Sequence, residues 1–156
     1  MEFRLAQPAD LPHLRSMIIE SFGPITWFRQ LDERIGPLNG CDWRRRWEIR
    51  LEKVFNSQTL LVGEVDGRIV AAATGDYDPQ TALGLVDLLA VDPAEQGKGY
   101  GRAMLRGMLD HFRSLGALYC TLECLADNEK GNALYRAEGW LPVTQSNRWF
   151  IELEDR

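Results

Sequence analysis

Basic residues are in short supply in this sequence. Its 18 lysines and arginines stand against 23 acidic residues, which gives a net charge of −5 at pH 7. Proteins that bind nucleic acid through its phosphates usually carry the opposite sign. Long hydrophobic runs are also missing, because the longest candidates, such as residues 69–74, are strand-sized, whereas a membrane helix needs roughly 18 apolar residues. We therefore expect neither a nucleic-acid partner nor a membrane.

Cysteine and histidine are scarce, with three and two residues respectively. An odd cysteine count without a C-x-x-C pair argues against a disulfide framework and fits a reducing compartment. The histidines have no Cys, His or Asp partner at metal-ligand spacing, so no metal is expected. The first five residues, MEFRL, lack the basic and apolar regions of a signal peptide. These absences predict a cytoplasmic protein.

What the sequence does contain is typical of a globular domain: 156 residues, 45% hydrophobic and 26% charged. No repeat, low-complexity tract or linker interrupts it, so residues 1–156 are expected to form a single domain. Helical periodicity and strand-like runs occur along the whole chain. Helices are expected within residues 8–22, 43–55, 104–115 and 128–137, with a short helix and turns in 25–42. Strands are expected over residues 3–5, 59–65, 68–74, 83–91, 117–122, 140–143 and 149–153.

The turn Asp66-Gly67 predicts a hairpin between two of these strands, because Asp-Gly suits a tight two-residue turn. Early hairpins favour a mixed sheet over an all-parallel one. We therefore expect an α/β fold with a mixed, mostly antiparallel central sheet flanked by helices.

The most informative segment is VDPAEQGKGYGR, residues 91–102, which joins an expected strand to an expected helix. Three glycines at alternate positions allow neighbouring backbone N–H groups to converge, and the helix N-terminus adds partial positive charge. Such a turn suits a phosphate or pyrophosphate, with Lys98 and Arg102 at its rim. A plain helix-capping turn is the alternative.

Two other phosphate-binding loops do not fit this segment. A P-loop has Ser or Thr after Gly-Lys, whereas Lys98 is followed by Gly99. A dinucleotide-binding loop has a third glycine where Arg102 stands.

Gln96, Gly99 and Gly101, following a strand, resemble the signature of the GNAT superfamily of acyl-CoA-dependent N-acetyltransferases. The resemblance implies a GNAT-like fold in which the turn binds the pyrophosphate of acetyl-CoA and the preceding strand binds its pantetheine arm. By position, these cofactor-binding roles fall on Leu89, Ala90, Val91, Gln96, Gly97, Lys98, Gly99, Tyr100, Gly101 and Arg102.

Residues 128–140 resemble a second element of the same family, in which an Asn and a Tyr lie near the pantetheine and the sulfur. Asn128 and Tyr135 occupy these positions; Gly131 and Trp140 stand where Ala and Phe are usual. A phenol of pKa about 10 can protonate a departing thiolate of pKa about 8–9. Tyr135 is therefore the expected general acid, the alternative being a helix-surface aromatic that packs on the sheet.

The attacking amine also loses a proton, and two carboxylates are candidates to accept it. Glu123 ends the strand before this helix, where some relatives that acetylate protein N-termini carry a catalytic Glu. Activity near pH 7 would require partial burial to raise its pKa; the alternative is a solvated strand-end carboxylate. Asp87 is the rival, because strand alternation would place it on one face with Leu89 and Val91, where it could bind the amine or relay its proton. If that face does not line the acceptor pocket, Asp87 is an edge residue.

Two side-chain clusters leave alternatives open. The arginines at positions 44–46 and 50 alternate with Glu48 and Glu52, which favours a salt-bridged outer helix face over a site for an anionic partner. Four aromatic residues can form a wall that binds an ammonium group, or can pack in the core. They are Trp27, Phe28, Trp43 and Trp47.

The resemblance, which covers roughly residues 83–143, thus implies an enzyme that transfers an acetyl group directly from acetyl-CoA to a small amine or a peptide N-terminus. Transfer through an acetylated cysteine is a minor alternative. A non-catalytic acyl-CoA sensor and an interaction module are the other readings of this fold, and a homodimer is left open. The acceptor is usually chosen by the N-terminal third, which matches the family only in layout.

Overall fold

The computed structural model describes residues 1–153, and the chain divides into two compact parts, Met1–Glu123 and Cys124–Arg156. The first part contains five strands, four α-helices and two short 3-10 turns among its described residues. They are β1 Glu2–Leu5, a 3-10 turn Pro8–Asp10, α1 Leu11–Phe22, α2 Trp27–Ile35, α3 Trp43–Ser57, β2 Thr59–Val65, β3 Arg68–Asp78, β4 Leu83–Val91, a 3-10 turn Pro93–Glu95, α4 Tyr100–Leu115 and β5 Tyr119–Leu122.

The strands form one sheet in the order β1-β2-β3-β4-β5. All neighbours pair antiparallel except β4 and β5, which are parallel. Asp66 and Gly67 both have positive φ, 51° and 74°, as a two-residue hairpin turn between β2 and β3 requires. The mixed, mostly antiparallel sheet predicted from the sequence is confirmed.

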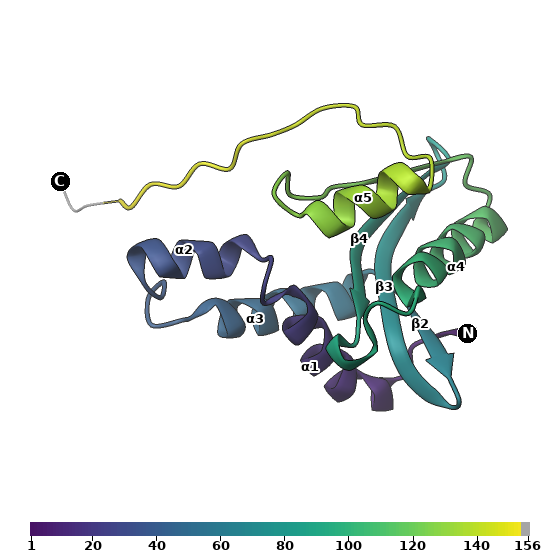
Figure 1. The fold of residues 1–156 in the computed structure, drawn as a ribbon, viewed down its shortest axis with the longest axis horizontal. Coiled ribbons are helices and arrows are strands. Elements are labelled where there is room, and N and C mark those ends of the chain that lie inside the picture. The colour runs from purple at the N-terminus through teal and green to yellow at the C-terminus, as the bar shows by residue number, and fades with distance from the viewer. Residues whose placement is uncertain (154–156) are drawn as a thin grey trace. The chain divides into compact units, whose positions relative to one another are not determined.

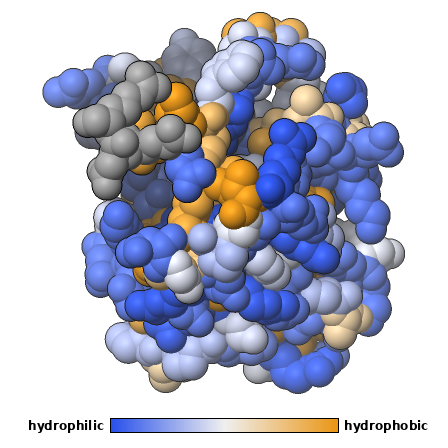
Figure 2. Space-filling model, turned by 90° about the vertical axis from the view of Figure 1, so that its left-hand side faces the viewer, coloured by the Kyte–Doolittle hydropathy of each residue, from blue (hydrophilic) through white to orange (hydrophobic). Residues whose placement is uncertain are grey.

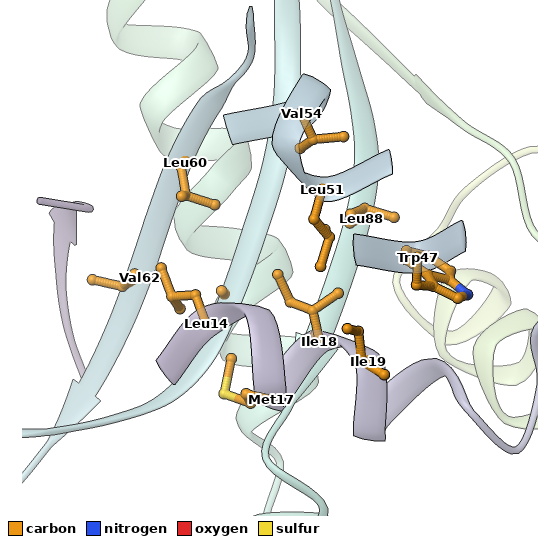
Figure 3. Packing of buried hydrophobic residues seen from close by; sticks show 12 residues of the cluster. Leu14, Met17, Ile18, Ile19, Trp47, Leu51, Val54, Leu60, Val62 and Leu88 are labelled. Carbon is orange, nitrogen blue, oxygen red and sulfur yellow. The ribbon is translucent and has the colours of Figure 1, made fainter. Parts of the chain in front are cut away.

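Helices α1 and α3 cover one face of the sheet and bury its main hydrophobic cluster (Figure 3). Apolar residues one helical turn apart point from both helices toward β2, β3 and β4, as their spacing predicts. The cluster consists of Leu14, Met17, Ile18, Ile19, Trp47, Leu51, Val54, Leu60, Val62, Ala72, Leu88 and Ala90.

Helix α4 covers the opposite face (Figure 1). Its Phe112 is buried against two strand glycines: a Cβ added at Gly84 would lie 2.7 Å from the Phe112 ring, and one at Gly75 would lie 3.0 Å from it. Glycine lets the aromatic ring approach the backbone of β3 and β4 directly. The sheet is therefore covered on both faces.

The second part contains α5, Glu129–Ala137, and no strand within its described residues. The expected strands over 140–143 and 149–153 are therefore wrong. Their apolar side chains are largely exposed, as for Leu141 at 82% and Trp149 at 88%. Such residues favour strands only where a neighbouring strand supplies hydrogen bonds and packing, and no ladder includes them among residues 1–153.

None of the helices formed by residues 1–153 is long and apolar enough to cross a membrane.

Candidate active site

Strands β4 and β5 separate halfway along β4. Their pairing runs only from Leu83 opposite Tyr119 to Val86 opposite Leu122, whereas β4 continues to Val91 and stays paired with β3. Within the described residues, positions 87–91 of β4 therefore have no strand neighbour on the β5 side. Their backbone groups on that side can hydrogen-bond a ligand in the way that a neighbouring strand would.

A β-bulge lies where this separation begins. Between β3 and β4 the register passes from Gly75 opposite Val86 to Thr74 opposite Leu88, so Asp87 is the extra residue. An extra residue shifts the alternation of side chains and re-aims them. The prediction that Asp87 shares a face with Leu89 and Val91 is therefore wrong: Asp87 lies on the α3 side, like its neighbour Leu88 in the main cluster.

Both oxygens of the Asp87 carboxylate accept hydrogen bonds, one from a side chain of α3 and one from Gln58, the residue that follows this helix. Arg50 Nη2 donates to Oδ1 at 2.8 Å, and Gln58 Nε2 donates to Oδ2 at 2.9 Å. The guanidinium of Arg50 also lies over the Trp47 ring, 4.9 Å from its centroid. Sequence reasoning missed Arg50 and Gln58 as partners of Asp87, because no local pattern links a helix to a strand so distant along the chain.

Glu123 follows directly after the last residue of β5, Leu122, which pairs with Val86 just before the bulge. The two candidate carboxylates, Glu123 and Asp87, thus lie at the level where the strands separate. Glu123 is exposed, so the structure does not show the partial burial that the sequence argument requires. Asp87 has hydrogen-bond partners at both oxygens.

The glycine-rich turn follows at the other end of β4. Gly97 and Gly99 both have left-handed φ, 82° and 83°, and a Cβ added at either would meet no atom within 4 Å. The space beside the turn is therefore open. Gly99 is the N-cap of α4 and supplies no side chain to the free amides of its first turn. Main-chain donors, a helix N-terminus and open space are what a pyrophosphate requires.

Two side chains in this turn are held by the protein itself. Gln96 Nε2 donates to the carbonyl of Val91 at 3.3 Å, which ties the turn to the end of β4. Lys98 Nζ lies 2.6 Å from Glu95 Oε2, and this hydrogen bond raises the pKa of Lys98. Lys98 therefore contributes less net positive charge to the rim than the sequence suggests.

In the second part, Asn128 caps α5: its side chain accepts from the backbone N–H of Gly131 at 3.1 Å. Capping alone accounts for an Asn at this position. Tyr135 packs edge-to-face on Trp140, with ring centroids 6.0 Å apart. Burial is the main cause that raises the pKa of Tyr135 to about 12, so the phenol stays protonated at neutral pH.

Burial is the main cause that raises the pKa of the free thiols Cys120 and Cys124, which lowers the fraction of reactive thiolate at neutral pH. This favours direct transfer over an acetyl-cysteine intermediate. Throughout the described chain, no group of three or more His, Cys, Asp or Glu side chains could hold a metal ion.

Three of the four aromatic side chains considered as an ammonium-binding wall already have a cation against one face of the ring. Arginine guanidiniums lie over three of them: Arg44 over Trp43, Arg46 over Phe28 and Arg50 over Trp47. Trp47 is itself part of the core. Seen from the α2 side, the molecular surface is mostly hydrophilic (Figure 2).

The salt-bridged outer face expected for α3 is only partly present. Arg45 pairs with Glu48 on the same helix, at 2.9 Å. The other three arginines, Arg44, Arg46 and Arg50, pair with Glu20, Asp32 and Asp87 on other elements. Most of these charges therefore connect α3 to its neighbours.

Comparison with known proteins identifies the family. Residues 27–140 match the model of the acetyltransferase (GNAT) family. The N-alpha-acetyltransferase RimI of Mycobacterium tuberculosis is 43% identical over 65 residues, which are 42% of this chain and only 39% of that protein.

Two solved structures share the fold. A tetramutant of the BH1408 protein from Bacillus halodurans has a TM-score of 0.71 at 16% identity, over 97% of this chain and 100% of that chain. An aminoglycoside N-acetyltransferase, AAC(6')-Iy, in complex with CoA has a TM-score of 0.67 at 10% identity, over 97% of this chain and 95% of that chain. At these identities the likeness extends to the fold alone.

Proposed function

Since the chain belongs to the GNAT family of acetyltransferases, we propose that it transfers an acetyl group from acetyl-CoA directly to the amine of a small molecule or a peptide N-terminus. The observation that carries this proposal is the stretch of β4, residues 87–91, that has no strand neighbour on the β5 side within the described residues and leads into the open glycine-rich turn. The amides of residues 97–102 bind the pyrophosphate. Backbone groups of Leu89, Ala90 and Val91 bind the pantetheine arm.

This placement fixes the direction of the cofactor. With its pyrophosphate at the turn, the pantetheine arm runs back along β4 from Val91 toward Asp87. The thioester then lies near the bulge, between Asp87 and the end of β5. In this proposal Glu123, which follows β5, lies beside the acyl group.

In the chemistry we propose, the amine nitrogen attacks the thioester carbon, and the C–S bond breaks as the tetrahedral intermediate collapses. Glu123 accepts the proton that the amine loses, directly or through a water. Tyr135 donates its phenolic proton to the departing sulfur, which leaves as a thiol. Asp87 is less suited to accept the proton, because Arg50 and Gln58 already donate to both of its oxygens.

The named proteins differ in acceptor. RimI is an N-alpha-acetyltransferase and AAC(6')-Iy is an aminoglycoside N-acetyltransferase, so a peptide N-terminus and a small amine both remain within the proposal. We further propose that residues 1–156 act as one catalytic domain, without a metal, in the cytoplasm.

The proposal is tested by following thiol release from acetyl-CoA with a panel of amines, polyamines, amino acids and short peptides. Release that depends on both enzyme and acceptor, together with the acetylated amine in mass spectrometry, supports it. If calorimetry detects acetyl-CoA binding but no acceptor is acetylated, the chain is a sensor. If acetyl-CoA does not bind at millimolar concentration, the fold serves as an interaction module.

A further inference from the structure

Two arginines of α3, one turn apart, are used in different ways. Arg46 is nearly buried, with 13% of its side chain exposed. Its guanidinium donates to Asp32 Oδ1 at 2.7 Å, to the Cys41 carbonyl at 2.8 Å and to the Phe28 carbonyl at 2.9 Å. Arg46 therefore holds together α2, α3 and the turn between them, and its donors are largely consumed.

Arg50 is more open, with 35% of its side chain exposed. A guanidinium has five N–H donors, yet within residues 1–153 only Asp87 Oδ1 accepts from Arg50. The Trp47 ring supports one face of the guanidinium, and Asp87 fixes one of its nitrogens. Arg50 is thus a cation that is held in position and that, within residues 1–153, has N–H donors available for a ligand.

The position of Arg50 matters because its partner is the bulge residue. If the arm of acetyl-CoA lies along residues 87–91 as proposed, its thioester is at the Asp87 end of that stretch. An amine that attacks the thioester must pass close to the groups around Asp87. Arg50 is therefore among the side chains that the rest of the acceptor meets.

The charge at this position is suited to an anionic group and not to a second cation. Asp87 is already paired with Arg50 and Gln58, so it offers little to a second cation. A guanidinium matches a carboxylate in shape and charge, and the two commonly form paired hydrogen bonds. The composition of the surrounding segment also favours an anionic ligand. Basic residues outnumber acidic ones in residues 27–58, although acidic residues are in excess in the whole chain.

We infer that Arg50 is a specificity-determining residue that binds a carboxylate of the acceptor. The inference rests on the proposed function and narrows it: the preferred acceptor is an amine with a carboxylate close to its amino group. Such a carboxylate is either the α-carboxylate of a free amino acid or an acidic side chain near the N-terminus of a peptide.

The test compares acceptors that differ only in this carboxylate. One arm uses alanine against alanine methyl ester, and the other uses a short amidated peptide with Asp or Asn at its second position. The enzymes are the wild type, Arg50→Gln, Arg50→Lys and, as a control on the same helix, Arg45→Gln, whose partner is the exposed Glu48. Thermal unfolding shows whether each variant is folded.

We expect the wild type to favour the carboxylate-bearing acceptor of one arm by at least about tenfold in kcat/KM. The arm that shows this preference tells whether the carboxylate belongs to a free amino acid or to an acidic side chain of a peptide. Arg50→Gln should remove the preference by raising KM about tenfold or more, with kcat and the Kd for acetyl-CoA little changed. Arg50→Lys should restore part of it, and Arg45→Gln should behave as wild type.

Equal kcat/KM for charged and neutral acceptors in both arms would overturn the inference and leave the proposed function intact. An equal loss for both acceptors in Arg50→Gln would do the same, since it would indicate a structural role. Absence of thiol release with every acceptor would instead overturn the proposed function and, with it, this inference.

Discussion

The two halves of the candidate site differ in the kind of chemical group that forms them, backbone in one and side chains in the other. The half assigned to acetyl-CoA consists of backbone: residues 87–91 of β4, which pair with β3 but not with β5, the glycines of the turn and the first amides of α4. The half assigned to the acceptor consists of side chains, namely Asp87, Arg50 and Gln58. Backbone groups can be kept while sequences change, whereas side chains must change to suit a new acceptor. This is why a family motif identifies the cofactor and leaves the acceptor open.

The largest effect is expected at Tyr135, the side chain that we propose donates a proton to the leaving sulfur. Replacing Tyr135 by Phe removes the only proton that this residue can donate to the leaving sulfur, so kcat should fall about 100-fold or more, as for loss of a general acid. The KM for acetyl-CoA should change little. Steady-state thiol release measures both values, and an unchanged kcat would remove Tyr135 from the mechanism.

The pH dependence of stability provides an independent measurement on Tyr135. Its folded-state pKa of about 12 lies above the ordinary tyrosine value of about 10. Burial of the neutral phenol therefore contributes stability that is complete below pH 10 and is lost as the pH rises toward 12. Tyr135→Phe should lose less stability than the wild type across this alkaline range, as followed by denaturant unfolding.

A backbone change should affect the cofactor half next. Gly99→Val forces a branched residue into left-handed φ and fills the open space beside the turn. Strain of this kind costs about 1–3 kcal/mol, so the Kd for CoA measured by calorimetry should rise roughly tenfold to 100-fold. Lys98→Ala is the matched control: its charge is already paired with Glu95, and we expect a change within about threefold. A larger loss in Lys98→Ala than in Gly99→Val would contradict a backbone-built site.

The smallest effect is expected for Glu123, which is exposed and can be replaced by water as the proton acceptor. Glu123→Gln should lower kcat about tenfold, less than the roughly 100-fold to 10,000-fold typical of general acid–base catalysis, and flatten the acidic limb of the pH–rate profile. The isosteric variant Asp87→Asn is the comparison. If the acidic limb persists in Glu123→Gln and disappears in Asp87→Asn, the proton acceptor is Asp87.

Local sequence patterns were sufficient where a structure depends on near neighbours. Helical spacing predicted α1, α3 and α4, and Asp66-Gly67 predicted the hairpin between β2 and β3. The position of the glycine-rich turn could be predicted because it depends on local backbone geometry. Gly97 and Gly99 adopt positive φ, and Gly99 is an N-cap without a side chain.

The failures involve partners distant along the chain. A bulge depends on how β3 lies against β4, so strand alternation misplaced Asp87 relative to Leu89. Arg50 of α3 pairs with Asp87 of β4, and no sequence pattern within either segment indicates this contact. The apolar residues at 140–143 and 149–153 have the composition of strands, but a strand also requires a neighbour, which composition does not reveal.

The central claim is that main-chain groups of β4 and the turn after it bind acetyl-CoA. A crystal structure of the protein with acetyl-CoA tests it most directly. We expect the pyrophosphate against the amides of residues 97–102, and the pantetheine arm hydrogen-bonded to residues 87–91 with its thioester at the Asp87 end. A pyrophosphate bound elsewhere, or an arm that leaves this stretch of β4 uncovered, would contradict the account.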